Sequence, residues 1–267
     1  MRIFYPDLDN TLIYSYKHDI GHAKRCAEIY QGREISFMTE KTHRLLTKIK
    51  SQALIVPVTT RTIEQYARID LGIGQLACAL VCNGGVLLAD GKEDRLWYEE
   101  SCRLISNCQS QLAYGESLMN RDKNRCFEVR NIRGLFLFTK SEKPPESVDY
   151  LKAALDPDLV NVFSNGIKIY IVPKLLNKGT AVRRFNERLK PEYSIAAGDS
   201  DFDIPMLEAA DFALAPQELE IKIGSKTNIE YMQGSEVFSD ALLMHVKSAL
   251  LANAAAGSRR NVLYNNT

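Results

Sequence analysis

The chain has 267 residues, enough for one large domain or two modest ones with a substantial buried core. Hydrophobic residues make up 45% and charged residues 25%, the usual mixture of a soluble globular protein. The 34 basic side chains nearly cancel the 33 acidic ones, which argues against a nucleic-acid-binding or membrane-surface protein. No apolar run approaches the roughly 20 residues that cross a bilayer, and residues 1–6 lack the order of a signal peptide. We therefore expect a cytoplasmic protein without nucleic-acid or membrane partners, either a monomer or a weak homo-oligomer.

The first third of the chain alternates short apolar runs with amphipathic segments, and the same pattern resumes after residue 172. Apolar strands that alternate with helices are typical of a parallel sheet, so the pattern predicts an α/β core. A hairpin around Gln31-Gly32 is also expected, at 24–38. In chain order, the expected core elements are strands at 3–5, 54–58 and 76–81 with helices at 41–50 and 62–69, then a helix at 178–189, a strand at 194–197, a helix at 204–210, a strand at 212–214 and a final helix at 239–251, before an Asn-rich end that should fray.

The middle of the chain has a different pattern, in which hairpins are joined to helices. Asn83-Gly84-Gly85 is a strong turn signal, and Asn165-Gly166 is the strongest hairpin signal in the chain. The expected elements are a strand at 86–88, a helix at 99–119, strands at 126–132 and 135–139, a helix at 144–155 and hairpin strands at 160–164 and 167–172. We therefore predict a Rossmann-like parallel-sheet core made of residues 1–83 and 173–267, interrupted by an inserted α+β cap at 84–172.

Two acidic clusters each follow a predicted core strand. Asp7 and Asp9 come directly after the first strand, and Asp199, Asp201 and Asp203 follow the strand at 194–197. The carboxyl ends of parallel strands meet at one edge of a sheet, where ligands bind. Helix capping would explain one aspartate at either place, but five like charges destabilise a fold unless a cation neutralises them. Because carboxylate oxygens are natural ligands of Mg²⁺, the clusters predict a magnesium site.

Two other polar residues are predicted at the same edge. Thr59 ends the second strand and offers a hydroxyl group there, and Lys178 begins the helix that follows the cap. A helix N-terminus already favours anions, and an ammonium group strengthens that preference. Taken singly, either signal is weak, because a threonine at a strand end is usually a cap and a lone lysine is usually solvated.

Taken together, these residues resemble the motifs of the haloacid dehalogenase superfamily of phosphatases. The resemblance covers the whole core, and the insert resembles the large, C2-type cap of the Cof-like and sucrose-phosphatase-like branch. Two positions depart from that branch: Thr60 stands where glycine is common, and Phe202 stands where asparagine is usual. The motifs are, in chain order, Asp7-x-Asp9-x-Thr11, Thr59, Lys178 and Gly198-Asp199-x-x-x-Asp203.

The resemblance implies a role for each motif residue. Asp7 would be the nucleophile, and as an aspartate it is already ionised at neutral pH. Asp9 would give a proton to the leaving group and later take one from water, because one carboxyl group can do both. For the rest, Asp7, Asp199 and the main-chain carbonyl of Asp9 would hold Mg²⁺, Thr59 and Lys178 would bind the substrate phosphate, and Asp203 would hold Lys178 or a metal-bound water in place.

These roles imply an Mg²⁺-dependent phosphatase that hydrolyses a small phosphorylated metabolite, foremost a sugar phosphate, through an aspartyl-phosphate. A phosphomutase of the phosphomannomutase type is an alternative, and it would need a cluster of cap arginines to grip a second phosphate. A non-catalytic binding module is disfavoured because every charged catalytic position is filled. Substrate choice should lie in the cap, whose basic residues include Arg121, Lys123, Arg125, Arg130, Arg133 and Lys168.

Overall fold

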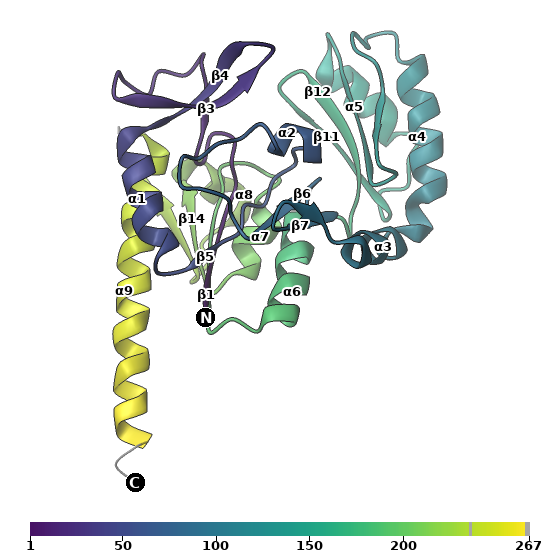
Figure 1. Ribbon diagram of the computed structural model, residues 1–267. Helices are drawn as coiled ribbons and strands as arrows, with labels where there is room; N and C mark the ends of the chain where they lie inside the picture. The colour runs from purple at the N-terminus through teal and green to yellow at the C-terminus, as the bar shows by residue number, and fades with distance from the viewer. Residues whose placement is uncertain (235–236, 265–267) are drawn as a thin grey trace.

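The structure is a computed structural model that describes residues 1–234 and 237–264, with side chains as far as residue 254. Its centre is a parallel sheet of five strands in the order β15-β14-β13-β1-β5 (Figure 1). This arrangement confirms the predicted α/β core. The strands are β1 (Arg2–Pro6), β5 (Leu54–Ile55), β13 (Tyr193–Ala197), β14 (Phe212–Pro216) and β15 (Ile229–Met232).

Helices cover both faces of this sheet. Successive side chains of a strand point to opposite faces, so Ile3 and Tyr5 of β1 pack on one side and Phe4 on the other. The side with Ile3 and Tyr5 is covered by α6 (Lys178–Leu189) and α7 (Ile204–Ala209), and the side with Phe4 by α1 (Glu40–Lys50) and α9 (Phe238–Tyr264). In Figure 1, α9 runs beside α1 and then extends beyond the rest of the fold. No helix among the described residues is long and apolar enough to span a membrane.

A small three-stranded sheet follows β1 and stands above one side of the core. Its order is β2-β4-β3, with β2 at Tyr14–Ser15, β3 at Lys24–Tyr30 and β4 at Arg33–Thr39. Strands β3 and β4 form the hairpin that the sequence predicts around Gln31-Gly32, and we call this pair the flap hairpin. Figure 1 shows it at the carboxyl ends of the core strands, across from the segment between β7 and β12.

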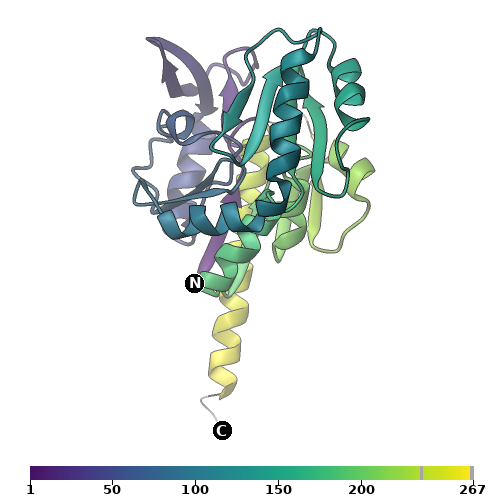
Figure 2. The same cartoon turned by 90° about the vertical axis from the view of Figure 1, so that its right-hand side faces the viewer.

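The segment predicted as a cap contains an antiparallel sheet of four strands in the order β11-β12-β10-β9, which we call the cap sheet. One face carries Leu137, Ile169 and Ile171, which pack against two helices, α4 (Gln109–Arg121) and α5 (Pro144–Lys152). Figure 2 shows α4 in front of this sheet. The predicted Asn165-Gly166 hairpin is confirmed by β11 and β12. The strands are β9 (Arg130–Ile132), β10 (Phe136–Lys140), β11 (Val160–Asn165) and β12 (Lys168–Pro173).

Several predicted elements differ from the observed ones. The helix predicted at 99–119 is two helices, α3 (Arg95–Leu104) and α4, separated by a 3₁₀ turn at Ser106–Cys108. Serine and asparagine are poor helix formers, and the break lets α3 and α4 pack against different layers. The strand predicted at 126–132 is ordered as a strand only from Arg130, and the sequence prediction missed β15.

Other differences concern the ends of elements. The predicted helix at 62–69 is shorter, because α2 covers only Ile63–Tyr66, with a capping box from Thr62. In the other direction, the final helix is longer than the 239–251 that the sequence predicts. Its Asn-rich end falls on residues 265–267, outside the described part of the chain.

A second three-stranded sheet lies at the predicted boundary between core and cap. It pairs β6 (Cys78–Val81), β7 (Val86–Ala89) and β8 (Lys92–Glu93) in antiparallel fashion around the Asn83-Gly84-Gly85 turn. The strand predicted at 76–81 therefore joins the core sheet only through a parallel bridge between Val58 and Leu80. The boundary after residue 83 stays a prediction, because this sheet has strands on both sides of it.

Candidate active site

Asp7 lies at the carboxyl end of β1, which is paired between β13 and β5 in the core sheet. Its backbone N–H donates to the carbonyl of Ala197, which ends the neighbouring strand β13 (2.8 Å). The side chain is buried, and one carboxylate oxygen accepts a hydrogen bond from Nζ of Lys178 at 2.5 Å. Two adjacent strands thus bring the first and last acidic motifs to the same place, as parallel topology predicts.

Lys178 is a buried cation held between two carboxylates. Its Nζ lies 2.5 Å from Oδ1 of Asp7 and 2.6 Å from Oδ1 of Asp203, and its side chain is 2% exposed. The two carboxylates raise its pKa and so outweigh burial, which acts to lower it. Close packing places it there: a Cβ on the next residue, Gly179, would meet the carbonyl oxygen of Pro205 at 2.0 Å. Lys178 therefore remains an ammonium ion at neutral pH.

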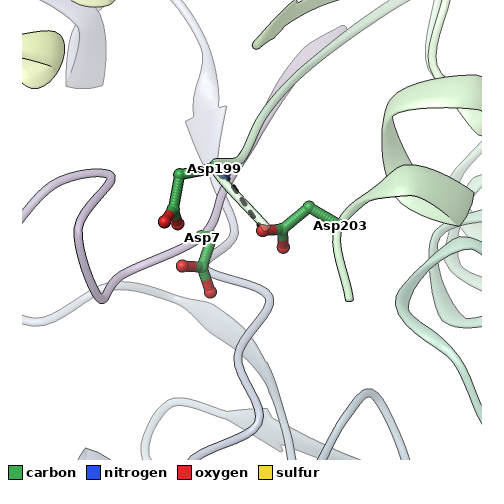
Figure 3. A group of neighbouring side chains, drawn as sticks. All are labelled: Asp7, Asp199 and Asp203. Carbon is green, nitrogen blue, oxygen red and sulfur yellow. Dashed lines mark hydrogen bonds between the residues drawn. The ribbon is translucent and has the colours of Figure 1, made fainter. Parts of the chain in front are cut away.

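Asp203 binds Lys178 and also holds the loop that carries Asp199 and Ser200. Its second oxygen, Oδ2, accepts from the backbone N–H of Asp199 (3.1 Å) and from both N–H and hydroxyl of Ser200 (2.9 and 2.8 Å), and Figure 3 shows the first of these bonds. The loop needs a glycine at 198, because a Cβ there would lie 2.3 Å from Cβ of Asp203. Both Asp203 oxygens are thus occupied by protein donors, as a positioning role requires.

The three carboxylates of Asp7, Asp199 and Asp203 form one cluster, and one oxygen from each lies within 4.8 Å of the others (Figure 3). Burial raises the pKa of Asp199 to about 7, with a further contribution from the charge of Asp203. Burial also raises the pKa of Asp7 well above its ordinary value, against the opposing effect of Lys178. The single charge of Lys178 offsets only part of the repulsion among these three carboxylates. Their oxygens are hard ligands. These residues therefore fit a divalent cation such as Mg²⁺.

The two predicted phosphate-binding residues lie on separate elements. Thr59 is fully buried after β5, and its hydroxyl oxygen accepts from the backbone N–H of Arg61 (3.2 Å), which leaves the hydroxyl proton for another acceptor. Lys178 is the residue already described between the carboxylates. Thr11, the last residue of the first motif, donates to Oδ1 of Asp199 at 3.1 Å and so links the two acidic loops.

The side chain of Asp9 lies outside the cluster. Arg61 binds both its oxygens in a fork, with Nε to Oδ2 at 2.8 Å and Nη2 to Oδ1 at 2.7 Å. The Asp9 side chain is half exposed, whereas that of Arg61 is only 12% exposed. The structure therefore groups Asp203, rather than the Asp9 carboxylate, with Asp7 and Asp199. A metal contact through the main-chain carbonyl of Asp9 stays a prediction.

Comparisons with known proteins agree with this geometry. A family model described as haloacid dehalogenase-like hydrolase matches residues 93–218, which include Lys178, Asp199 and Asp203. A phosphoglycolate phosphatase of Methanopyrus kandleri is 28% identical over 180 residues, or 66% of this chain and 75% of the relative. A second, from Methanothrix thermoacetophila, is 28% identical over 174 residues, or 64% of this chain and 72% of the relative. Over residues 93–218 the chain is thus similar to the haloacid dehalogenase-like hydrolases, and over about two thirds of its length to two phosphatases.

Solved structures share this fold over nearly the whole chain. The sucrose-phosphatase of Synechocystis, solved with sucrose and phosphate, has a TM-score of 0.63 at 16% identity and covers 94% of this chain and 98% of its own. A protein of Thermotoga maritima has a TM-score of 0.55 at 17% identity and covers 91% and 97%. Because the similarity covers more than nine tenths of the chain, the shared fold includes the segment predicted as a cap.

Phe202, which follows the acidic loop of the core, contacts the cap sheet. Its ring makes edge-on contacts with Phe163 and Tyr170, at centroid distances of 4.6 and 5.2 Å. Tyr170 stacks in turn on Phe138 at 5.8 Å, so an aromatic row crosses the face of the cap sheet that is turned toward the core. Phe202 thus makes an apolar contact between the core and the cap sheet.

Sequence reasoning missed two residues next to the site, Arg61 and Glu28. Arg61 was visible beside Thr59 in the second motif, and its charge at a strand end was an available signal. Glu28 carried no signal, because it lies in a different hairpin, 33 residues before Arg61 in the sequence. In the structure its buried carboxylate is 2.9 Å from Nη1 of Arg61.

Proposed function

We propose that this haloacid dehalogenase-like phosphatase hydrolyses small phosphorylated metabolites with Asp7 as nucleophile, in an Mg²⁺-dependent reaction. The observation that carries the proposal is the position of Asp7: a buried carboxylate at the carboxyl end of β1, 2.5 Å from a buried lysine and clustered with Asp199. A capping aspartate would instead bind the N–H groups of a helix. Among the described residues this carboxylate makes no such contact, and its hydrogen-bond partner is the ammonium group of Lys178.

The first step would transfer the phosphoryl group to Asp7. A carboxylate oxygen attacks phosphorus, the bond to the leaving oxygen breaks, and an aspartyl-phosphate forms. Lys178 would remain charged and stabilise the anionic oxygens, and the hydroxyl proton of Thr59 would donate to one of them. Mg²⁺, held by Asp7, Asp199 and the Asp9 carbonyl, would offset the repulsion between the carboxylate and the phosphate.

The Asp9 carboxyl group would transfer the protons. It gives one to the leaving alkoxide in the first step and takes one from the attacking water in the second, which regenerates Asp7 and releases inorganic phosphate. Its half-exposed side chain supports this role, because a proton donor must reach the substrate oxygen and exchange with solvent. Asp203 would keep Lys178 in place through its 2.6 Å contact.

Two substrate classes are proposed for the site. A sugar phosphate is the first, in line with the sequence resemblance. A short phosphorylated carboxylic acid is the second, since the curated relatives are phosphoglycolate phosphatases. Lys168 of the cap sheet favours the second: its ammonium group makes no hydrogen bond or ion pair with the described residues. Burial lowers the pKa of Lys168, and the charge of Asp9 raises it, which supports a position near Asp9 where the ammonium group would pair with a substrate carboxylate.

The phosphomutase alternative has less support. It needs several cap arginines that are free to grip a second phosphate near Asp7. Arg130 and Arg133 instead pair with Glu128 and Glu93 of the same segment, and Arg125 donates to the carbonyl of Phe127.

A cytoplasmic location also stays a proposal, supported by six cysteines that are all free thiols.

The proposal is tested by phosphate release from a panel of sugar phosphates, phosphoglycolate and p-nitrophenyl phosphate. We expect release that requires Mg²⁺, is lost with a chelator and returns when the metal is restored. Asp7→Asn should lower kcat by roughly four orders of magnitude or more, because it removes the nucleophile. The control is Asp201→Asn, a neighbouring aspartate that pairs only with Lys222 on the surface. Release from no member of the panel, or an active Asp7→Asn variant, would contradict the proposal.

A further inference from the structure

The flap hairpin contains a buried carboxylate that the reaction outlined above does not use. Glu28 lies on β3, and its side chain is 1% exposed. The pairing of β3 with β4 shifts register on both sides of Glu28, and the residue forms an isolated bridge with Ile69. Such irregularities redirect a side chain away from its regular position. Here the redirected side chain points from the hairpin into the core.

Three donors from different segments bind this carboxylate. Nη1 of Arg61 lies 2.9 Å from Oε2, Nε of Arg68 lies 3.0 Å from Oε1, and the hydroxyl of Ser36 donates to Oε2 at 2.9 Å. A buried carboxylate is costly unless it is paired in this way. Glu28 thus ties the flap hairpin to the segment that directly follows Thr59.

Arg61 carries this connection to Asp9. One edge of its guanidinium group, Nε and Nη2, binds both oxygens of Asp9, and the remaining nitrogen, Nη1, binds Glu28. A fork of two parallel hydrogen bonds fixes the plane of a carboxylate as well as its distance. An arginine held at one edge only would keep several side-chain conformations. Because Glu28 holds the other edge of Arg61, this freedom is reduced. The three side chains therefore form a line from the hairpin to the half-exposed carboxyl group of Asp9.

We propose that Glu28 is a positioning residue of this phosphatase, which orients Arg61 and, through it, the carboxyl group of Asp9 for proton transfer to the leaving oxygen. The inference rests on the proposed function, because it takes the proton-transfer role of Asp9 from there. It adds a requirement that the known motifs do not contain: the flap hairpin must be seated for Asp9 to act. Hairpin and catalytic loop are then coupled through one guanidinium group.

The experiment compares leaving groups, because only a poor leaving group needs a proton. Wild type and Glu28→Gln are assayed with p-nitrophenyl phosphate, whose leaving group departs as a stable anion, and with an alkyl phosphate such as glycerol phosphate. The value of kcat/KM reports the steps up to loss of the leaving group. For Glu28→Gln we expect kcat/KM to fall at least about tenfold with the alkyl phosphate, within the range of general acid catalysis. It should change less than about twofold with the aryl phosphate.

Controls separate positioning from folding. Glu34→Gln removes one charge from an exposed position of the same hairpin and should leave both kcat/KM values near wild type. Arg61→Lys keeps the charge but loses the fork, and it should reproduce the dependence on the leaving group even if Glu28→Gln fails to fold. Asp9→Asn removes the proton donor itself. Its loss of kcat/KM with the alkyl phosphate is therefore the largest loss that misplacing the Asp9 carboxyl group could cause.

The outcomes are distinct. Equal losses with both phosphates in Glu28→Gln and Arg61→Lys would overturn the inference and reduce the network to a structural link. Unchanged values with the alkyl phosphate would overturn it as well. If wild type hydrolyses neither phosphate, the proposed function itself fails, and that result is separable because it needs no variant.

Discussion

The carboxyl edge of the core sheet and the facing side of the cap sheet differ in how their charges are satisfied. On the core edge, Asp7, Lys178 and Asp203 are buried and held by contacts of 2.5 to 3.1 Å. On the cap side, aromatic rings stack in a row, and Lys168 has no bonded partner among the described side chains. The side chains of the core edge are thus held by protein contacts, whereas Lys168 on the cap side makes no hydrogen bond or ion pair with the described residues. We propose that the core edge carries the chemistry and that the cap side carries the selectivity.

The largest expected effect comes from breaking the core edge. Lys178→Met leaves two buried carboxylates without their cation and should destabilise the metal-free protein by about 3–5 kcal/mol. Lys222→Met is a matched control, because it removes a lysine with the same 2.6 Å contact to an aspartate, but on the surface. Its cost should stay within about 1 kcal/mol. Urea unfolding of both variants measures the two costs, and equal values would contradict the claim that burial separates these ion pairs.

The next effect is the pH dependence of metal binding at the same edge. Asp199 has a pKa of about 7 in the metal-free fold, so it must lose a proton before it binds Mg²⁺ at pH 5.5. For one proton and this pKa, the affinity should rise about 30-fold between pH 5.5 and pH 8. Titration calorimetry at the two pH values measures the change, and the heat in buffers of different ionisation enthalpy reports the proton released. A flat affinity profile would show that Asp199 does not bind the ion.

The stability of the metal-free protein should move in the opposite direction. The pKa of Asp199 is raised above its unfolded value, so the folded state binds more protons between about pH 4 and pH 7. Its contribution to stability is present below that window and is lost as the pH rises through about 7. The melting temperature without metal should therefore fall over this range, and added Mg²⁺ should restore more of it at pH 8 than at pH 5.5.

The smallest effect should come from the cap side. Lys168→Met should lower kcat/KM about tenfold for phosphoglycolate, which offers a carboxylate, and leave p-nitrophenyl phosphate nearly unchanged. Lys143→Met is the control, a cap lysine that pairs with Glu146 on the helix α5. Equal losses for both substrates would contradict the division between a fixed core edge and a selective cap. If Lys168→Met instead caused a large loss of sugar phosphate hydrolysis, Lys168 would bind the sugar phosphate class of substrate.

The core was predictable because its signals are local. Apolar runs such as Ile3-Phe4-Tyr5 mark buried strands, and acidic residues directly after them are brought to one edge by parallel topology alone. The hairpin signal at Asn165-Gly166 is equally local and is confirmed by β11 and β12. The longer helix predicted at 99–119 failed at Ser106–Cys108, where packing against two layers outweighs the helical pattern. The strand β15 was missed for a similar reason: its four residues are a strand only beside β14.

The sequence alone determined that Asp7 and Asp199 would follow two strands of one parallel sheet. The α/β class of the core followed from the same spacing. Only the tertiary structure decided what each carboxylate contacts. Asp203, rather than the side chain of Asp9, joins the cluster around Asp7, and Arg61 and Glu28 hold Asp9 from a separate hairpin. The physical reason is range: apolar runs and the acidic residues that follow them are signals within a few residues, whereas an ion pair between residues 28 and 61 exists only after two segments have packed together.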